Sequence, residues 1–76
     1  MAITPTAQTG RNVRAEMARA GITQADLAAA LRVSQAAVSA RLLGKTPFDI
    51  NELSTIAATL GVQLDVLLPQ PDEAVA

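Results

Sequence analysis

The stretch that decides the fold is residues 23–44, which read TQADLAAALRVSQAAVSARLLG. Thr23 precedes Asp26 by three residues, which is the spacing of a capping box. In that arrangement the hydroxyl accepts an N–H of the first turn, and the carboxylate lies at the positive end of the helix dipole. The spacing therefore predicts a short helix over residues 24–31. The side chains that it is expected to bury are Leu27, Ala28 and Leu31.

A second helix is predicted after a turn of only three or four residues. Arg32 and Val33 interrupt the apolar pattern, and Ser34 is a residue type that favours the N-cap position. We expect this helix to run to about Leu43 and to end at Gly44, because glycine readily adopts the left-handed conformation that closes helices. Two short helices joined in this way form a helix-turn-helix unit over residues 23–44, whose second helix presents its N-terminal residues outward.

The segments on either side of this unit also favour helices. Upstream, residues 1–6 contain a proline and no apolar periodicity, so we expect a flexible arm. A helix should then run from about Ala7 or Thr9 to Ala20 and stop at Gly21. The residues on its expected buried face are Val13, Met17 and Ala20.

Downstream, a loop over residues 45–48 should place Phe48 against the core. Asp49 and Glu52 form another capping pair, and the helix that they begin should end at Gly61. A last helical turn over residues 64–68 is closed by proline, and residues 69–76 are predicted to form a disordered tail. The apolar stripe of the penultimate helix comprises Leu53, Ile56, Ala57 and Leu60.

Together these elements predict an all-α fold, a compact bundle of five short helices in one domain over residues 7–68. The chain has 76 residues, which is room for a single domain. Sixteen of them are alanine, the strongest helix former, and no alternating β-branched run suggests a strand.

Composition also excludes several kinds of chemistry. The chain has no cysteine and no histidine, so disulfides, thiolate nucleophiles and the usual zinc sites are excluded. We expect no catalytic residue, no metal, no cofactor and no small-molecule substrate, because helix capping already explains the carboxylates that acid–base catalysis would need. No secretory signal or membrane span is apparent, which predicts a cytoplasmic protein.

The charges are distributed unevenly although the net charge is only −1. All six cations fall within residues 1–47, where the net charge is +4, and residues 48–76 carry −5. A polyanion could dock on the positive part of the chain, but ordinary solvated helix surfaces would give the same pattern.

The combination TQADLA at 23–28, VSQ at 33–35 and GK at 44–45 resembles the lambda-repressor-like (Cro/repressor-type, XRE) helix-turn-helix family. The resemblance covers roughly residues 9–68, and the chain also looks like small repressors of actinobacteria and their phages. It implies binding to double-stranded DNA, with the second helix of the unit in the major groove. When bound, such a protein would be associated with the nucleoid.

The resemblance also implies which residues contact DNA. Gln35 is the strongest candidate for reading a base, because a glutamine amide can pair bidentately with adenine. Ala36 and Ala40 offer only apolar contact to a thymine methyl group, and Arg41 is expected to reach guanine or a phosphate. The candidate base contacts are Ser34, Gln35, Ala36, Ser39, Ala40 and Arg41. The candidate phosphate contacts are Thr23, Gln24, Arg11, Arg14, Lys45 and Thr46.

Three positions depart from the family pattern. Arg41 stands where an apolar residue is usual, and Leu43 stands where a polar one is usual. Arg32 replaces a glycine in a turn that often needs positive φ, which costs a non-glycine residue roughly 1–2 kcal/mol. These departures affect individual base contacts and not the expected fold.

The sequence can be interpreted as a protein of one of three functional classes. The leading hypothesis is a sequence-specific DNA-binding regulator, a phage- or prophage-type repressor that binds a palindromic operator as a homodimer. Residues 62–68 are either its dimer surface or a helix that closes the core. The alternative is a protein-binding module or antitoxin-like partner that retains the fold, which the low net charge favours. An enzyme has almost no support, since the only acid–base candidates are carboxylates whose capping roles already explain them.

Overall fold

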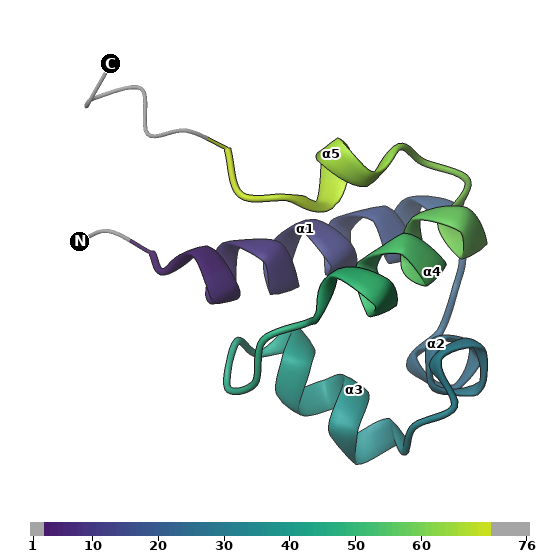
Figure 1. Cartoon of the computed structure of the whole chain (residues 1–76). Helices are drawn as coiled ribbons and strands as arrows, with labels where there is room; N and C mark the ends of the chain where they lie inside the picture. Colours follow the sequence, from purple (N-terminus) through teal and green to yellow (C-terminus); the bar gives the residue numbers. More distant parts are fainter. Residues whose placement is uncertain (1–2, 71–76) are drawn as a thin grey trace.

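The computed structural model describes residues 3–70 of the chain. Within this range there are five helices and no strand, which confirms the all-α prediction. The helices are α1 (Pro5–Ala20), α2 (Gln24–Leu31), α3 (Gln35–Leu42), α4 (Ile50–Leu60) and α5 (Leu64–Leu67) (Figure 1).

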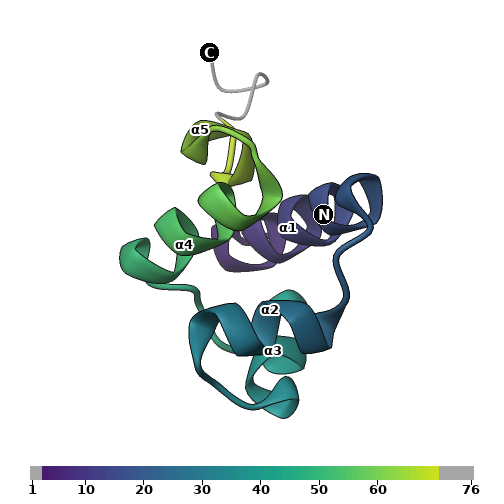
Figure 2. The ribbon, with the colours of Figure 1, turned by 90° about the vertical axis from the view of Figure 1, so that its right-hand side faces the viewer.

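The helices form a central pair with smaller elements on either side. α1 crosses the middle of the molecule and packs on α4, and α5 lies on one side of this pair (Figure 1). α2 and α3 pack on each other on the opposite side, where α2 contacts α4 and α3 contacts α1 (Figures 1 and 2). The helix-turn-helix unit is therefore held from one side only, and the other side of α2 and α3 is free of the other helices.

The core is built from the faces that these helices turn toward one another. Every residue of the apolar stripe predicted for α4 is buried, as are Val13 and Met17 in α1. Ala20 is exposed, so its predicted burial was wrong, and Leu31 and Phe48 are only partly buried against the core. The buried apolar residues are Val13, Met17, Leu27, Ala28, Val38, Leu42, Leu53, Ile56, Ala57, Leu60 and Leu67.

Local capping explains why α2 and α4 begin where they do. Thr23 and Asp26 form the predicted box, with the Asp26 N–H donating to Thr23 Oγ1 at 3.1 Å and the Thr23 N–H donating to Asp26 Oδ2 at 3.0 Å. Asp49 and Glu52 form the same box at the start of α4. At the other ends, Gly21 and Gly61 close α1 and α4 in the left-handed conformation.

The first helix begins earlier than the sequence analysis placed it. Thr4 is the N-cap, and Pro5 is the first helical residue, where the missing N–H of proline costs nothing. Residues 5 and 6 thus belong to α1 and not to an arm, while residues 1–2 lie outside the described range. At the other end, residues 71–76 of the predicted tail also lie outside it.

The last helix closes the core. Leu67 is fully buried in α5, and the Asn12 side chain in α1 donates to the carbonyl oxygens of Leu67 at 3.3 Å and Leu68 at 3.1 Å. Of the two roles considered for residues 62–68, these contacts support the closing helix. Val66 is exposed and does not contribute to that core.

In the part of the chain that the model describes, no helix is long and apolar enough to cross a membrane. Within the same residues there is no cluster of three or more histidine, cysteine or acidic side chains that could bind a metal.

Candidate nucleic-acid interface

The exposed side of α3 is the centre of the candidate interface. Val38 and Leu42 determine which face of the helix is turned inward, because both are buried against its neighbours. Gln35 and Ala36, in the first turn, are consequently exposed. A side chain here can reach outward without displacing any part of the core, which is the geometry that reading the edge of a base requires.

The other candidate base contacts lie at the start of α3 and further along it. Ser34 is the N-cap, and its Oγ accepts the N–H of Ala37 at 3.0 Å. The hydroxyl hydrogen of Ser34 remains available to donate outward. Ser39 and Ala40 are half-buried, so they contribute a shallow surface beside the first turn.

Leu43 adds an apolar side chain to the same side of α3. It follows Ala40 by three residues and Ala36 by seven, which is the spacing of one helix face. Its side chain is 56% exposed. The helical spacing of Leu43 from Ala36 and Ala40 is the sequence signal that places it on this side.

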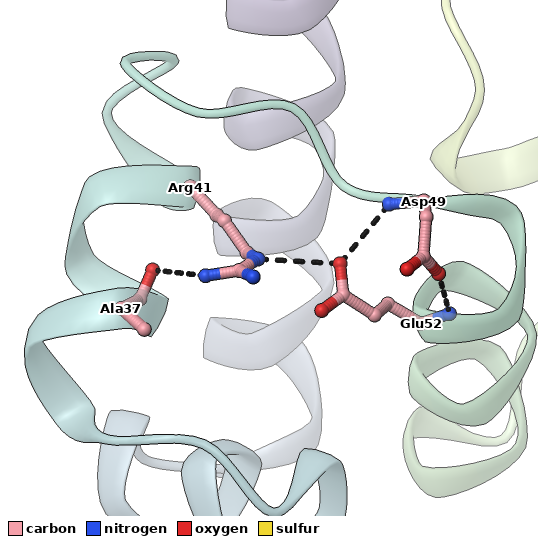
Figure 3. A network of polar contacts seen from close by, with 4 residues as sticks. All are labelled: Ala37, Arg41, Asp49 and Glu52. Carbon is pink, nitrogen blue, oxygen red and sulfur yellow. Dashed lines mark hydrogen bonds and ion pairs between the residues drawn. The ribbon is translucent and has the colours of Figure 1, made fainter.

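Arg41 is the candidate base contact that the structure places elsewhere. Its Nε donates to Glu52 Oε1 at 3.2 Å, and one terminal nitrogen donates to the Ala37 carbonyl oxygen at 3.0 Å (Figure 3). The Arg41 and Glu52 side chains are only 18% and 16% exposed. The Arg41 side chain thus lies along the flank of α3 and pairs with an acidic partner on α4, while contact with a base or a phosphate stays a prediction.

The start of α2 forms the second part of the candidate interface. Thr23 and Gln24 are both exposed, and Gln24 is the first residue of the helix. Among the described residues, no acceptor is paired with the backbone N–H of Gln24 or Ala25, which leaves these groups to a solvent molecule or an anion.

Asp26 limits how strongly this helix end attracts an anion. The backbone N–H of Thr23 hydrogen-bonds to the Asp26 carboxylate, and the Thr23 side chain makes a smaller contribution. Both hold the pKa of Asp26 below its ordinary value. Asp26 is therefore ionised at neutral pH, and its charge opposes part of the positive potential at the start of α2. The start of α2 therefore offers an anion hydrogen-bond donors more than net positive charge.

The remaining candidates are cationic or polar residues on α1 and after α3. Arg11, Arg14, Lys45 and Thr46 are all exposed. The ion pairs formed within residues 3–70 are Arg19 with Glu16 and Arg41 with Glu52, so neither uses these cations.

Two close backbone approaches bring the start of α1 to the end of α3. A Cβ atom on Gly10 would lie 2.5 Å from the Leu42 carbonyl oxygen. Gly44 has φ 80°, and a Cβ atom there would lie 2.8 Å from the Cα atom of Ala7. Lys45 and Thr46 follow this turn directly, so they start from the same corner of the molecule as the first turns of α1.

Ala28 and Arg32 complete the helix-turn-helix geometry. Ala28 is 6% exposed at the packing of α2 on its neighbours, in agreement with the small side chain expected at a helix crossing. Arg32 ends α2 with φ 58°, the only positive φ of a non-glycine residue in the described range. The strain anticipated for this turn is present.

Comparison with known proteins agrees with this geometry. The model of the helix-turn-helix family matches residues 13–67, which is more than two thirds of the chain. The chain therefore belongs to the helix-turn-helix family, in its lambda-repressor-like (XRE) branch. Among curated protein sequences, none matches significantly.

Solved structures of regulators share the fold. The clp gene regulator ClgR from C. glutamicum is 28% identical, with a TM-score of 0.79 over 87% of each chain. A hypothetical transcription factor, NHTF from Neisseria, is 26% identical, with a TM-score of 0.78 over 95% of this chain and 83% of that one. The restriction-modification controller C.AhdI from Aeromonas hydrophila, at 17% identity, covers 83% of this chain and 96% of its own with a TM-score of 0.75, and shows the fold alone.

The family and these regulators define the class of the protein. It is a helix-turn-helix protein of the class that binds double-stranded DNA and regulates transcription.

Proposed function

We propose that this chain is a sequence-specific repressor of the phage or prophage type, which binds a palindromic operator as a homodimer. The observation that carries the proposal is the exposed first turn of α3, where Gln35 and Ala36 lie beside the capped start of α3. The packing of Val38 and Leu42 keeps this turn pointed away from the core. A helix start presented in this way fits the major groove.

Gln35 is the principal specificity residue in this proposal, through bidentate pairing with adenine. Ser34 donates its free hydroxyl hydrogen, and Ala36, Ser39 and Ala40 form a shallow surface against the base edges. Phosphates on the two sides of the groove are contacted by polar or cationic residues. These are Thr23, Gln24, Arg11, Arg14, Lys45 and Thr46.

A homodimer is proposed because one such module makes few base contacts. Two copies whose recognition helices lie about 34 Å apart would read successive major grooves on one side of the duplex. The operator would then be a palindrome with one half-site for each copy. The repressor assignment is supported by the resemblance carried by TQADLA, VSQ and GK.

The test is selection of bound sequences from a random duplex pool, followed by titration of the selected operator at several salt concentrations. We expect a palindrome, two protein chains per duplex by ultracentrifugation, and a negative salt slope of several units. The Gln35→Ala variant should lose preference for adenine at one position of each half-site. Gln63→Ala is the matched control, because Gln63 is exposed and makes no capping hydrogen bond at the start of α5.

Failure to enrich any motif with folded protein at low salt would contradict the proposal. A specific complex with a protein partner that persists at salt concentrations which abolish DNA binding would favour the protein-binding alternative. Repression itself is checked by placing the selected operator across a reporter promoter, where expression should fall when the protein is supplied.

A further inference from the structure

The recognition helix α3 is held unequally by its neighbours. It packs directly on α1 and α2, but no Cα atom of α3 lies within 8 Å of a Cα atom of α4. The buried residues of α3 are Val38 and Leu42 alone. Apolar burial is not directional, so these two side chains keep α3 on the core without by themselves fixing its tilt toward α4.

One side chain crosses this separation. Arg41 extends from α3 to α4, where its Nε donates to Glu52 Oε1 at 3.2 Å (Figure 3). The same oxygen accepts the backbone N–H of Asp49 at 3.0 Å, so the acceptor is itself fixed by the capping box of α4. One turn back on α3, the Ala37 carbonyl oxygen accepts a second hydrogen bond from the guanidinium at 3.0 Å.

These contacts give the link the directionality that the apolar contacts lack. A charge-assisted hydrogen bond depends steeply on distance and angle. The Arg41 and Glu52 side chains are largely shielded from solvent, with 18% and 16% exposure. This limits the screening of their attraction by water and salt. Changing the tilt of α3 would stretch the bond to Glu52.

We propose that Arg41 is a positioning residue, which holds α3 at the tilt that presents Gln35 to the major groove and does not itself touch DNA. This inference rests on the proposed function. Glu52 is the ion-pair partner that this role requires, because its charge neutralises that of Arg41 and keeps the guanidinium on the flank of α3. Specificity is thus set partly by a residue that faces the protein.

The test compares Arg41→Met and Glu52→Gln with the wild-type protein. Methionine keeps an unbranched side chain but removes the charge and the donors, while glutamine keeps an acceptor for Asp49 and removes the charge. Dissociation constants are measured for the selected operator, for an operator with altered half-site bases and for random duplex, each at several salt concentrations. Circular dichroism confirms that each variant is folded.

We expect both variants to lower discrimination between the selected and altered operators, by about fivefold for Arg41→Met and less for Glu52→Gln. The salt slope and the affinity for random duplex should stay at wild-type values, because no phosphate contact is removed. The double variant should discriminate no worse than Arg41→Met alone, since both changes break one link. Arg19→Met, which breaks an exposed ion pair on α1, is the matched control and should leave discrimination unchanged.

Direct contact between Arg41 and DNA predicts different changes in the salt slope and in the affinity for DNA. Arg41→Met would then reduce the salt slope by about one unit and weaken binding to random duplex. Glu52→Gln would release a cation and tighten binding, which overturns the inference even if Arg41→Met does not fold. If the wild-type protein discriminates and both variants retain this discrimination, the inference alone fails. If the wild-type protein shows no discrimination, the proposed function fails as well.

Discussion

Gly10 of α1 and Leu42 of α3 meet at a point where there is no room for a side chain, because a Cβ atom on Gly10 would lie 2.5 Å from the Leu42 carbonyl oxygen. The C-terminal end of α3 therefore rests on the backbone of α1. Gly44 makes a similar approach to Ala7 one turn further along. These contacts define where the recognition helix ends relative to the longest helix of the fold.

Replacing Gly10 with alanine should destabilise the protein. Alanine is favoured over glycine inside a helix by about 1 kcal/mol, but the clash with a backbone atom forces α1 and α3 apart at a cost of typically 1–3 kcal/mol. We expect a net loss of about 1 kcal/mol in the free energy of unfolding, measured by urea denaturation. In the reciprocal control, Ala15→Gly at an exposed position of α1 should lose about 1 kcal/mol through helix propensity alone. A stabilised Gly10→Ala variant would refute the close packing.

Replacing Arg32 with glycine should stabilise the protein. Arg32 has φ 58°, a conformation that costs a non-glycine residue roughly 1–2 kcal/mol. Glycine removes this strain, but its greater freedom in the unfolded chain offsets about 0.4–1 kcal/mol of the stabilisation. The midpoint of thermal unfolding should rise by a few degrees, since about 1 kcal/mol shifts it by roughly 4–8 °C in a domain of this size. Arg32→Lys is the control, because it keeps the charge and the strain. Equal midpoints for the glycine and lysine variants would count against strain at this turn.

The capping box of α2 should make stability depend on acidic pH. Hydrogen bonds from Thr23 lower the pKa of Asp26 in the folded protein below its ordinary value of 3.8. The stabilisation is therefore complete above that value and is lost as the pH falls through the lowered pKa. Asp26→Asn should be less stable than wild type at neutral pH, and the difference between their unfolding midpoints should shrink as the pH falls below about 4. A difference that stays constant from pH 7 to pH 2 would contradict this assignment.

The apolar surface of α3 should make binding depend on thymine methyl groups. Ala36 and Ala40 lie on the side of the helix proposed to face the bases, and Leu43 extends that side. Replacing thymine by uracil in the selected operator removes the methyl group and keeps the base pairing. We expect weaker binding at one or more half-site positions, and Ala36→Gly should reduce that loss. Equal affinity for every uracil-containing operator would show that these residues do not read methyl groups.

Local signals explain why much of the helical pattern could be predicted. The boxes Thr23–Asp26 and Asp49–Glu52 join atoms three residues apart, so their effect does not depend on the rest of the fold. The starts of α2 and α4 follow from them. The start of α1 carries an equally local signal, because a threonine N-cap followed by proline at the first helical position marks Pro5. Proline is also typical of irregular chain, which is why residues 1–6 favoured a flexible arm.

The sequence by itself determined the five helices, their caps and the face of α4 that is buried, because all of these depend on residues within one or two turns of one another. Only the tertiary structure decided that Gly10 meets Leu42 and that Arg41 turns toward Glu52 instead of the exposed side of α3. Each of these contacts joins groups on different helices. Their formation depends on how the helices pack, and neither helix propensity nor apolar spacing specifies that geometry.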